Sequence, residues 1–138
     1  MTPPRQLVYA GLILVLGLAS LGNLTATLIA QAQPDLNGVY RCEGTNPDGS
    51  PYAGSVQITQ EGEAWLLSWE FEHSGEGVGI GLWNAPVLSV IFRTSDGTIG
   101  LSSYVLTDGR LVGKWTVPGA GKVFTETLTK MPERVAAP

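Results

Sequence analysis

The feature that most constrains this fold is an alternation of apolar and polar residues with a period of two, which recurs along most of the chain. The alternation is clearest at residues 65–72, where every second side chain is a tryptophan, a leucine or a phenylalanine. A period of two gathers apolar side chains on one face of a β-strand but scatters them around a helix. The sequence after residue 37 therefore predicts strands and no helix.

Seven such patterns follow one another at intervals of about ten to twelve residues. The members that we expect on the apolar side are Val56 and Ile58; Trp65, Leu67, Trp69 and Phe71; Val78, Ile80 and Leu82; Leu88, Val90 and Phe92; Ile99, Leu101, Ser103 and Val105; Leu111, Gly113, Trp115 and Val117; and Val123, Thr125 and Thr127. Short turn sequences separate them, including the dipeptides Asp96-Gly97 and Asp108-Gly109. Asp-Gly between two alternating runs is a strong hairpin signal, because both central residues of a type I′ turn need positive φ.

Sequential hairpins predict an all-β fold, a single small antiparallel meander of about eight strands. With no helix to cover its apolar face, the sheet must close on itself or fold over. We expect a closed or nearly closed up-and-down barrel, with a two-sheet sandwich as the alternative. The expected organisation is a barrel domain at residues 38–130, preceded by a linker at 33–37 and followed by a flexible tail at 131–138.

The first 32 residues differ in character from the rest. An apolar run extends from Leu7 to Ala30, preceded by the single cation Arg5, and small residues occupy Ala30 and Ala32. This arrangement is typical of a signal peptide with cleavage after Ala32, which predicts an extracytoplasmic protein in the periplasm, a lumen or the medium. The alternative is a retained signal-anchor helix at 7–30, because about 20 apolar residues suffice to cross a bilayer.

Charge and cysteine content exclude several function classes. The chain has 8 Lys and Arg residues against 12 Asp and Glu, and no basic cluster, so nucleic acid is not an expected partner. A membrane partner is expected only if the N-terminal segment is retained. The single cysteine, Cys42, has no partner for an internal disulfide, and we expect it to be a buried strand residue.

No residue set in the sequence forms a catalytic or metal-binding signature, and no cofactor is expected. His73 is the only histidine, whereas a metal site needs several converging ligands and a general base needs a nucleophile. Glu70 and Glu72 lie two residues apart, which is typical of a solvent-facing pair on one strand. A hydrolase that uses these three residues remains as the enzyme alternative to a non-catalytic protein.

Aromatic residues are the stronger functional candidates. Most are expected in the core of a small barrel, Trp69 and Trp115 among them, but aromatic side chains at the end of a barrel can also hold a ring or a sugar. Trp83 directly follows Leu82, out of the expected apolar register and beside a turn, so we expect an exposed contact residue there. Tyr52 and Tyr104 are the further candidate contacts with a ligand or partner.

Several motifs resemble a family of small exported bacterial proteins that are mostly uncharacterised and loosely labelled fibronectin-binding-like. They are Gly38-Val39-Tyr40, the stretch GTNPDGSPYAG at residues 44–54, the stretch DGRLVGKW at 108–115 and the stretch GKVFTETL at 121–128. The resemblance covers about residues 36–129 and implies an extracytoplasmic all-β domain without a recognised catalytic set. The pattern Leu-x-Gly-x-Trp at 111–115 is also similar to lipocalin and avidin barrels, as an architectural likeness.

The function expected from the sequence is thus an extracytoplasmic, non-catalytic β-barrel that binds an unknown small molecule or protein partner. A membrane-anchored accessory subunit of a membrane complex is the alternative if residues 7–30 are retained.

Overall fold

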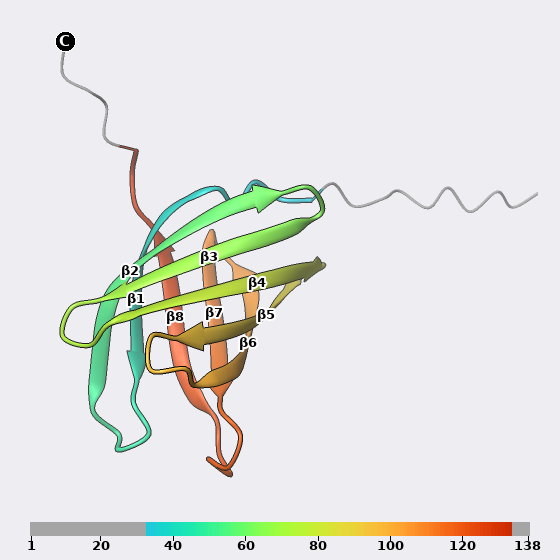
Figure 1. The fold of residues 1–138 in the computed structure, drawn as a ribbon. Coiled ribbons are helices and arrows are strands. Elements are labelled where there is room, and N and C mark those ends of the chain that lie inside the picture. Colours follow the sequence, from blue (N-terminus) through green and yellow to red (C-terminus); the bar gives the residue numbers. More distant parts are fainter. Residues whose placement is uncertain (1–32, 134–138) are drawn as a thin grey trace, which may run out of the picture. The chain divides into compact units, whose positions relative to one another are not determined.

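The computed structural model describes residues 33–133, and these form a closed antiparallel β-barrel in which each strand pairs with its neighbours in sequence (Figure 1). The eight strands are β1 (Gly38–Thr45), β2 (Pro51–Glu61), β3 (Ala64–Phe71), β4 (Glu76–Asn84), β5 (Val87–Thr94), β6 (Ile99–Thr107), β7 (Arg110–Thr116) and β8 (Phe124–Lys130). The expected all-β meander and its up-and-down barrel are confirmed. No helix within the described range has the length and apolarity that crossing a bilayer requires.

The barrel closes through a pairing of the first strand with the last. Five residues of β1, from Tyr40 to Gly44, pair with β8 from Lys130 back to Glu126. Closure leaves no strand edge with unpaired backbone groups, which is why a meander without covering helices is stable in this form. The two-sheet sandwich is therefore not the architecture of this chain.

The two ends of the barrel differ. The β2–β3, β4–β5 and β6–β7 turns lie at one end, together with the first and last described residues. Here Leu36 is buried and its carbonyl accepts a hydrogen bond from the Tyr40 hydroxyl at 2.9 Å. Residues 33–37, expected as a linker, thus place a side chain in the core, and we call this the closed end. The open end carries the β1–β2, β3–β4, β5–β6 and β7–β8 loops.

The core runs up the barrel axis from the closed end. Its fully buried side chains include Trp65, Ile58 and Val56 on β2 and β3, as the alternation predicted. Cys42 is also fully buried, which confirms the expectation for that residue. Burial raises the pKa of its thiol, and the neighbouring Glu126 carboxylate raises it further, so the thiol stays protonated and unreactive.

The expected register is wrong for three strands. On β4 and β6 the inward positions belong to Gly77, Gly79 and Gly81 and to Gly100, Ser102 and Tyr104, and on β8 they belong to Phe124, Glu126 and Leu128. Glycine faces inward on β4 because bulky neighbours already fill the space. A Cβ at Gly79 would lie 2.9 Å from Val90 Cγ1 and 3.0 Å from the Trp69 ring.

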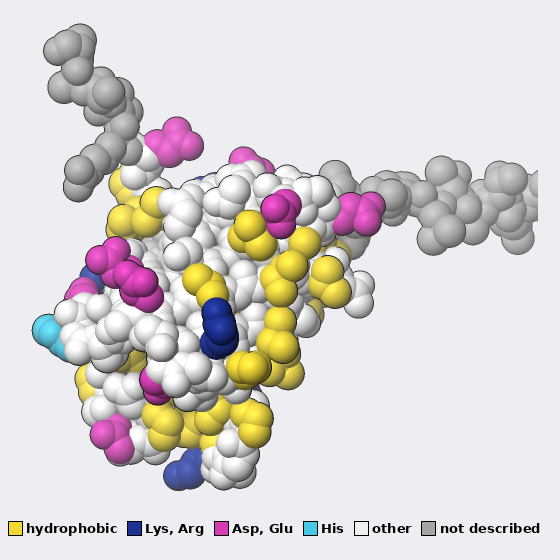
Figure 2. Space-filling model, in the orientation of Figure 1, with side chains coloured by type: hydrophobic (Ala, Val, Ile, Leu, Met, Phe, Trp, Pro, Cys, Tyr) yellow, Lys and Arg dark blue, Asp and Glu magenta, His cyan; other side chains and the backbone are white. Residues whose placement is uncertain are grey.

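The apolar residues of these strands consequently face outward. Val78, Ile80 and Leu82 on β4 are 48–66% exposed. Ile80 pairs with Ile91 on β5, which pairs with Leu101 on β6, so the exposed side chains form a continuous apolar row. Figure 2 shows hydrophobic side chains gathered in a band over the face where β4 and β5 lie in Figure 1.

Candidate ligand-binding cavity

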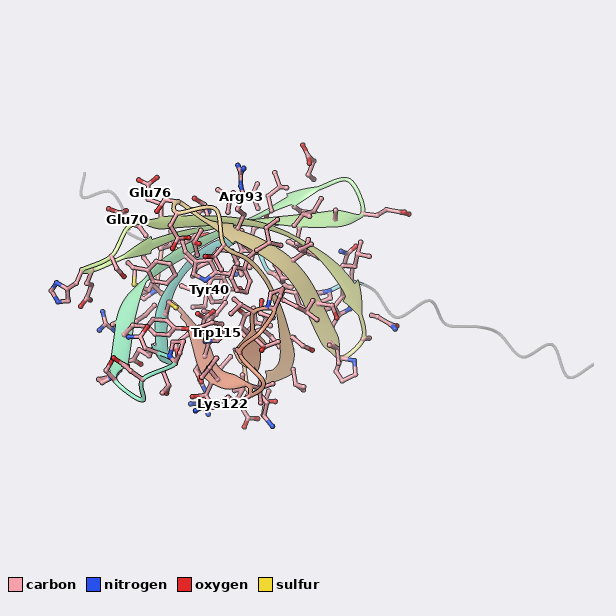
Figure 3. The ribbon with its side chains drawn as sticks, turned by 60° about the horizontal axis from the view of Figure 1, so that its bottom comes forward. Tyr40, Glu70, Glu76, Arg93, Trp115 and Lys122 are labelled. Carbon is pink, nitrogen blue, oxygen red and sulfur yellow. The ribbon has the colours of Figure 1, made fainter. Side chains whose placement is uncertain are left out.

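The open end of the barrel contains a cavity of about 470 Å³. Residues from all four loops at this end line its rim, and strands β2 to β8 contribute its walls. Figure 3 views the barrel with this end turned forward: Trp115 points into the interior, whereas Glu70 and Arg93 project from the outer surface. A volume of about 300–1,000 Å³ is typical of sites that bury small organic ligands.

Six aromatic side chains line the cavity: Tyr52, Trp69, Phe71, Phe92, Tyr104 and Trp115. Successive rings contact one another around the wall. The Phe92 ring packs against Trp69 and Trp115 with centroid distances of 6.2 Å, and the Tyr52 ring lies 5.6 Å from Phe71 at an interplanar angle of 87°. Tilted and edge-to-face contacts of this kind hold the rings in defined orientations, so the wall is largely formed before a ligand arrives.

One carboxylate is buried in this aromatic wall. Glu126 is 5% exposed and accepts three hydrogen bonds. Tyr52 donates to Oε2 at 2.5 Å, while Tyr104 and Trp69 Nε1 donate to Oε1 at 2.5 and 3.3 Å. Three donors stabilise an ionised carboxylate that would otherwise be costly to bury.

Two glycines allow the tyrosines to reach Glu126. Gly44 on β1 and Gly113 on β7 are the residues paired with Glu126 on its two sides, and they in turn pair with Tyr52 and Tyr104. A Cβ on either glycine would collide with the tyrosine ring beside it. Because each glycine lacks a side chain, each tyrosine ring can lie across the strand that carries the glycine. The five residues form one row around the barrel, in the order Tyr52, Gly44, Glu126, Gly113 and Tyr104.

The phenols in this row are held in their neutral form. Burial raises the pKa of Tyr104 well above its ordinary value, and the negative charge of Glu126 raises it further. The same two causes, in the same order, raise the pKa of Tyr52. Both hydroxyls therefore remain hydrogen-bond donors across the whole physiological pH range.

Two further polar groups in the cavity wall have no hydrogen-bond partner among the described residues. They are the hydroxyl of Ser102, which is 2% exposed, and the indole nitrogen of Trp115. Buried polar groups in folded proteins are nearly always paired, because an unpaired group costs about 1–3 kcal/mol. Both atoms are shielded from solvent, the Ser102 hydroxyl beside Tyr104 and the Trp115 nitrogen beside Tyr52, so they belong to the packed wall and are not exposed to the cavity.

The structure separates the three contact residues expected from the sequence. Tyr52 and Tyr104 line the cavity, and both donate to Glu126. The expected outward orientation of Trp83 is wrong: on β4 it shares the inward face with the glycines, is half-buried and packs against the core. It does not line the cavity.

Sequence reasoning missed Glu126, because β8 was interpreted in the opposite register. The signal was present as Phe124, Glu126 and Leu128, an apolar alternation with a carboxylate in its middle.

The residues of the hydrolase alternative do not meet in the cavity. His73 is exposed in the β3–β4 loop, and Glu70 and Glu72 are exposed outside the cavity lining. Among the described residues, no cluster of three or more His, Cys, Asp or Glu side chains could hold a metal ion.

Comparison with known proteins finds similarity of fold only. No protein-family model and no curated protein sequence matches the chain. A redesigned β-barrel is similar in structure, with a TM-score of 0.63 at 17% identity over 70% of this chain and 92% of the barrel. A redesigned barrel, mFAP1, solved with bound DFHBI, has a TM-score of 0.58 at 15% identity, covering 69% and 94%. A de novo designed fluorescence-activating barrel has a TM-score of 0.54 at 15% identity, covering 69% and 93%.

Proposed function

We propose that this protein is a non-catalytic binding barrel that takes a small, ring-containing molecule into the cavity at its open end. The observation that carries the proposal is the cavity of about 470 Å³ whose wall contains six aromatic side chains and the buried carboxylate of Glu126. Apolar walls with a few placed polar groups are the usual composition of small-molecule sites. The structurally similar barrel with bound DFHBI supports the view that a barrel of this size can hold an aromatic molecule.

The test is a binding screen that uses the protein's own fluorescence. Trp69 and Trp115 line the cavity, so an aromatic molecule that enters it should change tryptophan emission. A panel of neutral, cationic and anionic aromatic compounds is titrated into the full chain, and hits are confirmed by calorimetry. We expect at least one compound to bind, and a complete absence of binding across the panel would refute the proposal.

A matched pair of variants locates the binding. Ser102→Leu adds a bulky apolar side chain to the cavity wall, so it should abolish binding, and circular dichroism checks that the variant is folded before the titration. Ser103→Leu places the same side chain on the outer face of β6, where Ser103 is exposed, and should bind as the unmodified protein does. Equal binding by both variants would show that the ligand lies elsewhere.

We propose that the protein has no catalytic activity, because the candidate residues for hydrolysis do not converge. His73 and Glu72 lie outside the cavity lining. A screen against ester and glycoside substrates is the test. Turnover that is abolished in His73→Ala or Glu126→Gln, but not in Ser103→Leu, would replace the binding proposal with an enzymatic one.

We further propose that the barrel acts outside the cytoplasm. The support is the apolar run Leu7–Ala30, with the small residues Ala30 and Ala32 at its end. This segment lies outside the described residues. Intact mass spectrometry of the native protein is the test, and we expect a species that begins at Gln33. A species that begins at Met1 and needs detergent for extraction would instead support the membrane-anchored accessory subunit.

A further inference from the structure

The charges around the cavity are of one sign. The lining contains three carboxylates, Glu76, Asp96 and Glu126, and among the described residues no lysine or arginine contributes to it. Glu76 and Asp96 are exposed at the rim, whereas Glu126 is buried in the wall. Hydrogen bonds from Thr94 and Thr98 lower the pKa of Asp96, so this rim carboxylate stays ionised in mildly acidic solution. Carboxylates concentrated at a cavity attract cations towards it.

Glu126 has hydrogen-bond donors but no counter-charge. The ion pairs among the described residues join Arg41 to Glu43 and Glu72, all exposed and outside the cavity lining. The three groups that donate to Glu126 are neutral phenol and indole groups, so no positive charge among the described residues is paired with this carboxylate. A buried charge without an opposite charge is costly and is usually paired in folded proteins.

The carboxylate can also attract a further partner. An ionised carboxylate offers about four acceptor positions. Oε1 accepts from Trp69 and Tyr104, and Oε2 accepts from Tyr52, while the Cys42 thiol lies close enough to Glu126 for a side-chain hydrogen bond to raise the pKa of the thiol. A thiol is only a weak donor, so the carboxylate can still attract a positive charge from a molecule in the cavity.

The aromatic wall favours the same kind of ligand. The face of an aromatic ring attracts cations, and the attraction is worth about 2 kcal/mol or more when the cation is removed from water. Six rings surround the space beside Glu126. A strongly hydrated metal ion would find too few ligands there, because Glu126 is the only buried carboxylate in the described chain.

We infer that the ligand of this cavity is an organic cation, an amine or quaternary ammonium group on a small apolar body, whose positive charge pairs with Glu126 inside the aromatic wall. This inference rests on the proposed binding function and specifies its ligand class. The volume of the cavity and its apolar lining would also suit a neutral ring. The Glu126 carboxylate, which is not paired with a cation among the described residues, is what favours a cationic ligand over a neutral one.

The test compares two molecules of nearly the same shape that differ in charge. Phenyltrimethylammonium carries the positive charge, and tert-butylbenzene replaces its nitrogen by carbon. Both are titrated into the full chain, with tryptophan emission and calorimetry as readouts. We expect the cation to bind at least about tenfold more tightly, in line with the added ion pair and cation–π attraction.

Two charge-neutralising variants identify the residue responsible. Glu126→Gln keeps the shape of the side chain and one acceptor oxygen, so one tyrosine can still donate while the other can accept from the amide N–H. It should remove the part of the cation preference that comes from the ion pair and leave only the smaller cation–π part. Glu70→Gln removes the same charge from the outer face of β3, where Glu70 is exposed, and should leave the preference intact. Retention of the tenfold preference in Glu126→Gln would overturn the inference.

The outcomes separate the inference from the proposed function. If tert-butylbenzene binds as tightly as the cation, or more tightly, the cavity binds ligands but the charge assignment is wrong. If neither molecule nor any member of the aromatic panel binds, the proposed function fails as well. If Glu126→Gln does not fold, the cation preference of the unmodified protein is measured again in about 1 M salt. Salt at this concentration screens the exposed carboxylates Glu76 and Asp96, but it screens a buried ion pair much less. Loss of the preference in salt would show that the rim carboxylates cause it and would overturn the pairing with Glu126.

Discussion

Tyr104 on β6 donates a 2.5 Å hydrogen bond to Glu126 on β8, across the intervening strand β7. The residue between them in the sheet is Gly113, which pairs with both. The tyrosine ring occupies the space where a side chain of residue 113 would lie. A long-range contact in the cavity thus depends on the absence of a side chain at a third position.

Gly113→Ala should therefore destabilise the barrel. The new methyl group would collide with the Tyr104 ring and approach the backbone oxygen of Ser103 to 2.5 Å, and a backbone oxygen cannot rotate away. We expect a loss of about 1–3 kcal/mol in the free energy of unfolding, the usual cost of overpacking, measured by chemical denaturation. Gly109→Ala in the β6–β7 turn is not a suitable control, because Gly109 has a φ of 75°.

A better control is Ser103→Ala on the outer face of β6, where Ser103 is exposed. It should change the free energy of unfolding by less than about 0.5 kcal/mol. Equal stability of Gly113→Ala and Ser103→Ala would contradict the account of Tyr104 lying across β7.

Removing the tyrosine hydroxyl should cost more next to the carboxylate than at the closed end. Tyr104→Phe deletes a hydrogen bond to a charged acceptor, for which we expect a loss of about 1.5–3 kcal/mol. Tyr40→Phe deletes a hydrogen bond to the neutral carbonyl of Leu36 and should cost about 0.5–1.5 kcal/mol. Both tyrosines are almost fully buried, so urea denaturation of the two variants compares the acceptors directly. The reverse order would contradict this ranking of the two hydrogen-bond acceptors.

The barrel should lose stability in alkaline solution. The pKa values of Tyr40, Tyr52 and Tyr104 are all raised above their ordinary value of 10.0, first by burial. Their folded state thus keeps protons that the unfolded chain releases above pH 10, so their contribution to stability is complete below that pH and falls as the pH rises. Each such phenol lowers the free energy of unfolding by about 1.4 kcal/mol per pH unit above 10.

Two measurements check this pH dependence. Denaturation curves recorded between neutral pH and pH 11 should show a decline that begins near pH 9, the ordinary value of the Cys42 thiol, and becomes steeper above pH 10, where the tyrosines contribute as well. Phenolate absorbance should show these three tyrosines ionising together with unfolding. Ionisation of all three near pH 10 in a folded protein would be inconsistent with their burial.

The tryptophans should differ according to their position along the barrel axis. Trp65 is fully buried, and Trp65→Ala should cost about 3–5 kcal/mol because it leaves a cavity in packed surroundings. Trp115 is half-buried and lines the existing cavity. Trp115→Ala should cost about 2 kcal/mol or less, since it only enlarges a space that is already open. Thermal unfolding of both variants measures the difference. A larger loss of stability for Trp115→Ala would contradict the assignment of the packed core to the surroundings of Trp65.

The sequence predicted the barrel because alternation and turn chemistry are local properties. Trp65–Phe71 alternates so regularly that its register could be assigned directly. On β4 the same reasoning failed, because Val78, Ile80 and Leu82 suggest an inward face that the glycines occupy instead. The side chains that fill the space over these glycines, such as Trp69 and Val90, come from other strands.

The candidate site escaped sequence reasoning for a related reason. Tyr52 and Tyr104 were identifiable as aromatic residues on strands, but Glu126 gains its significance only from residues 22 to 74 positions away. A lone glutamate in a strand is normally exposed to solvent. Closure of the barrel places Gly44 and Gly113 on the two sides of Glu126, and the rings of Tyr52 and Tyr104 lie over these glycines.

The closed end described above determines how the molecule can be held. Gln33 donates to the Glu63 carbonyl beside the β2–β3 turn, and the backbone of Met131 donates to Val39 at the start of β1. The described part of the chain therefore begins and ends where Leu36 fills the barrel, opposite the cavity. A fluorescent reporter or a solid support joined directly before Gln33 or directly after Glu133 would leave the entrance facing the solution. The barrel of residues 33–133 could thus be immobilised as a sensor from either of these two points without blocking the path of its ligand.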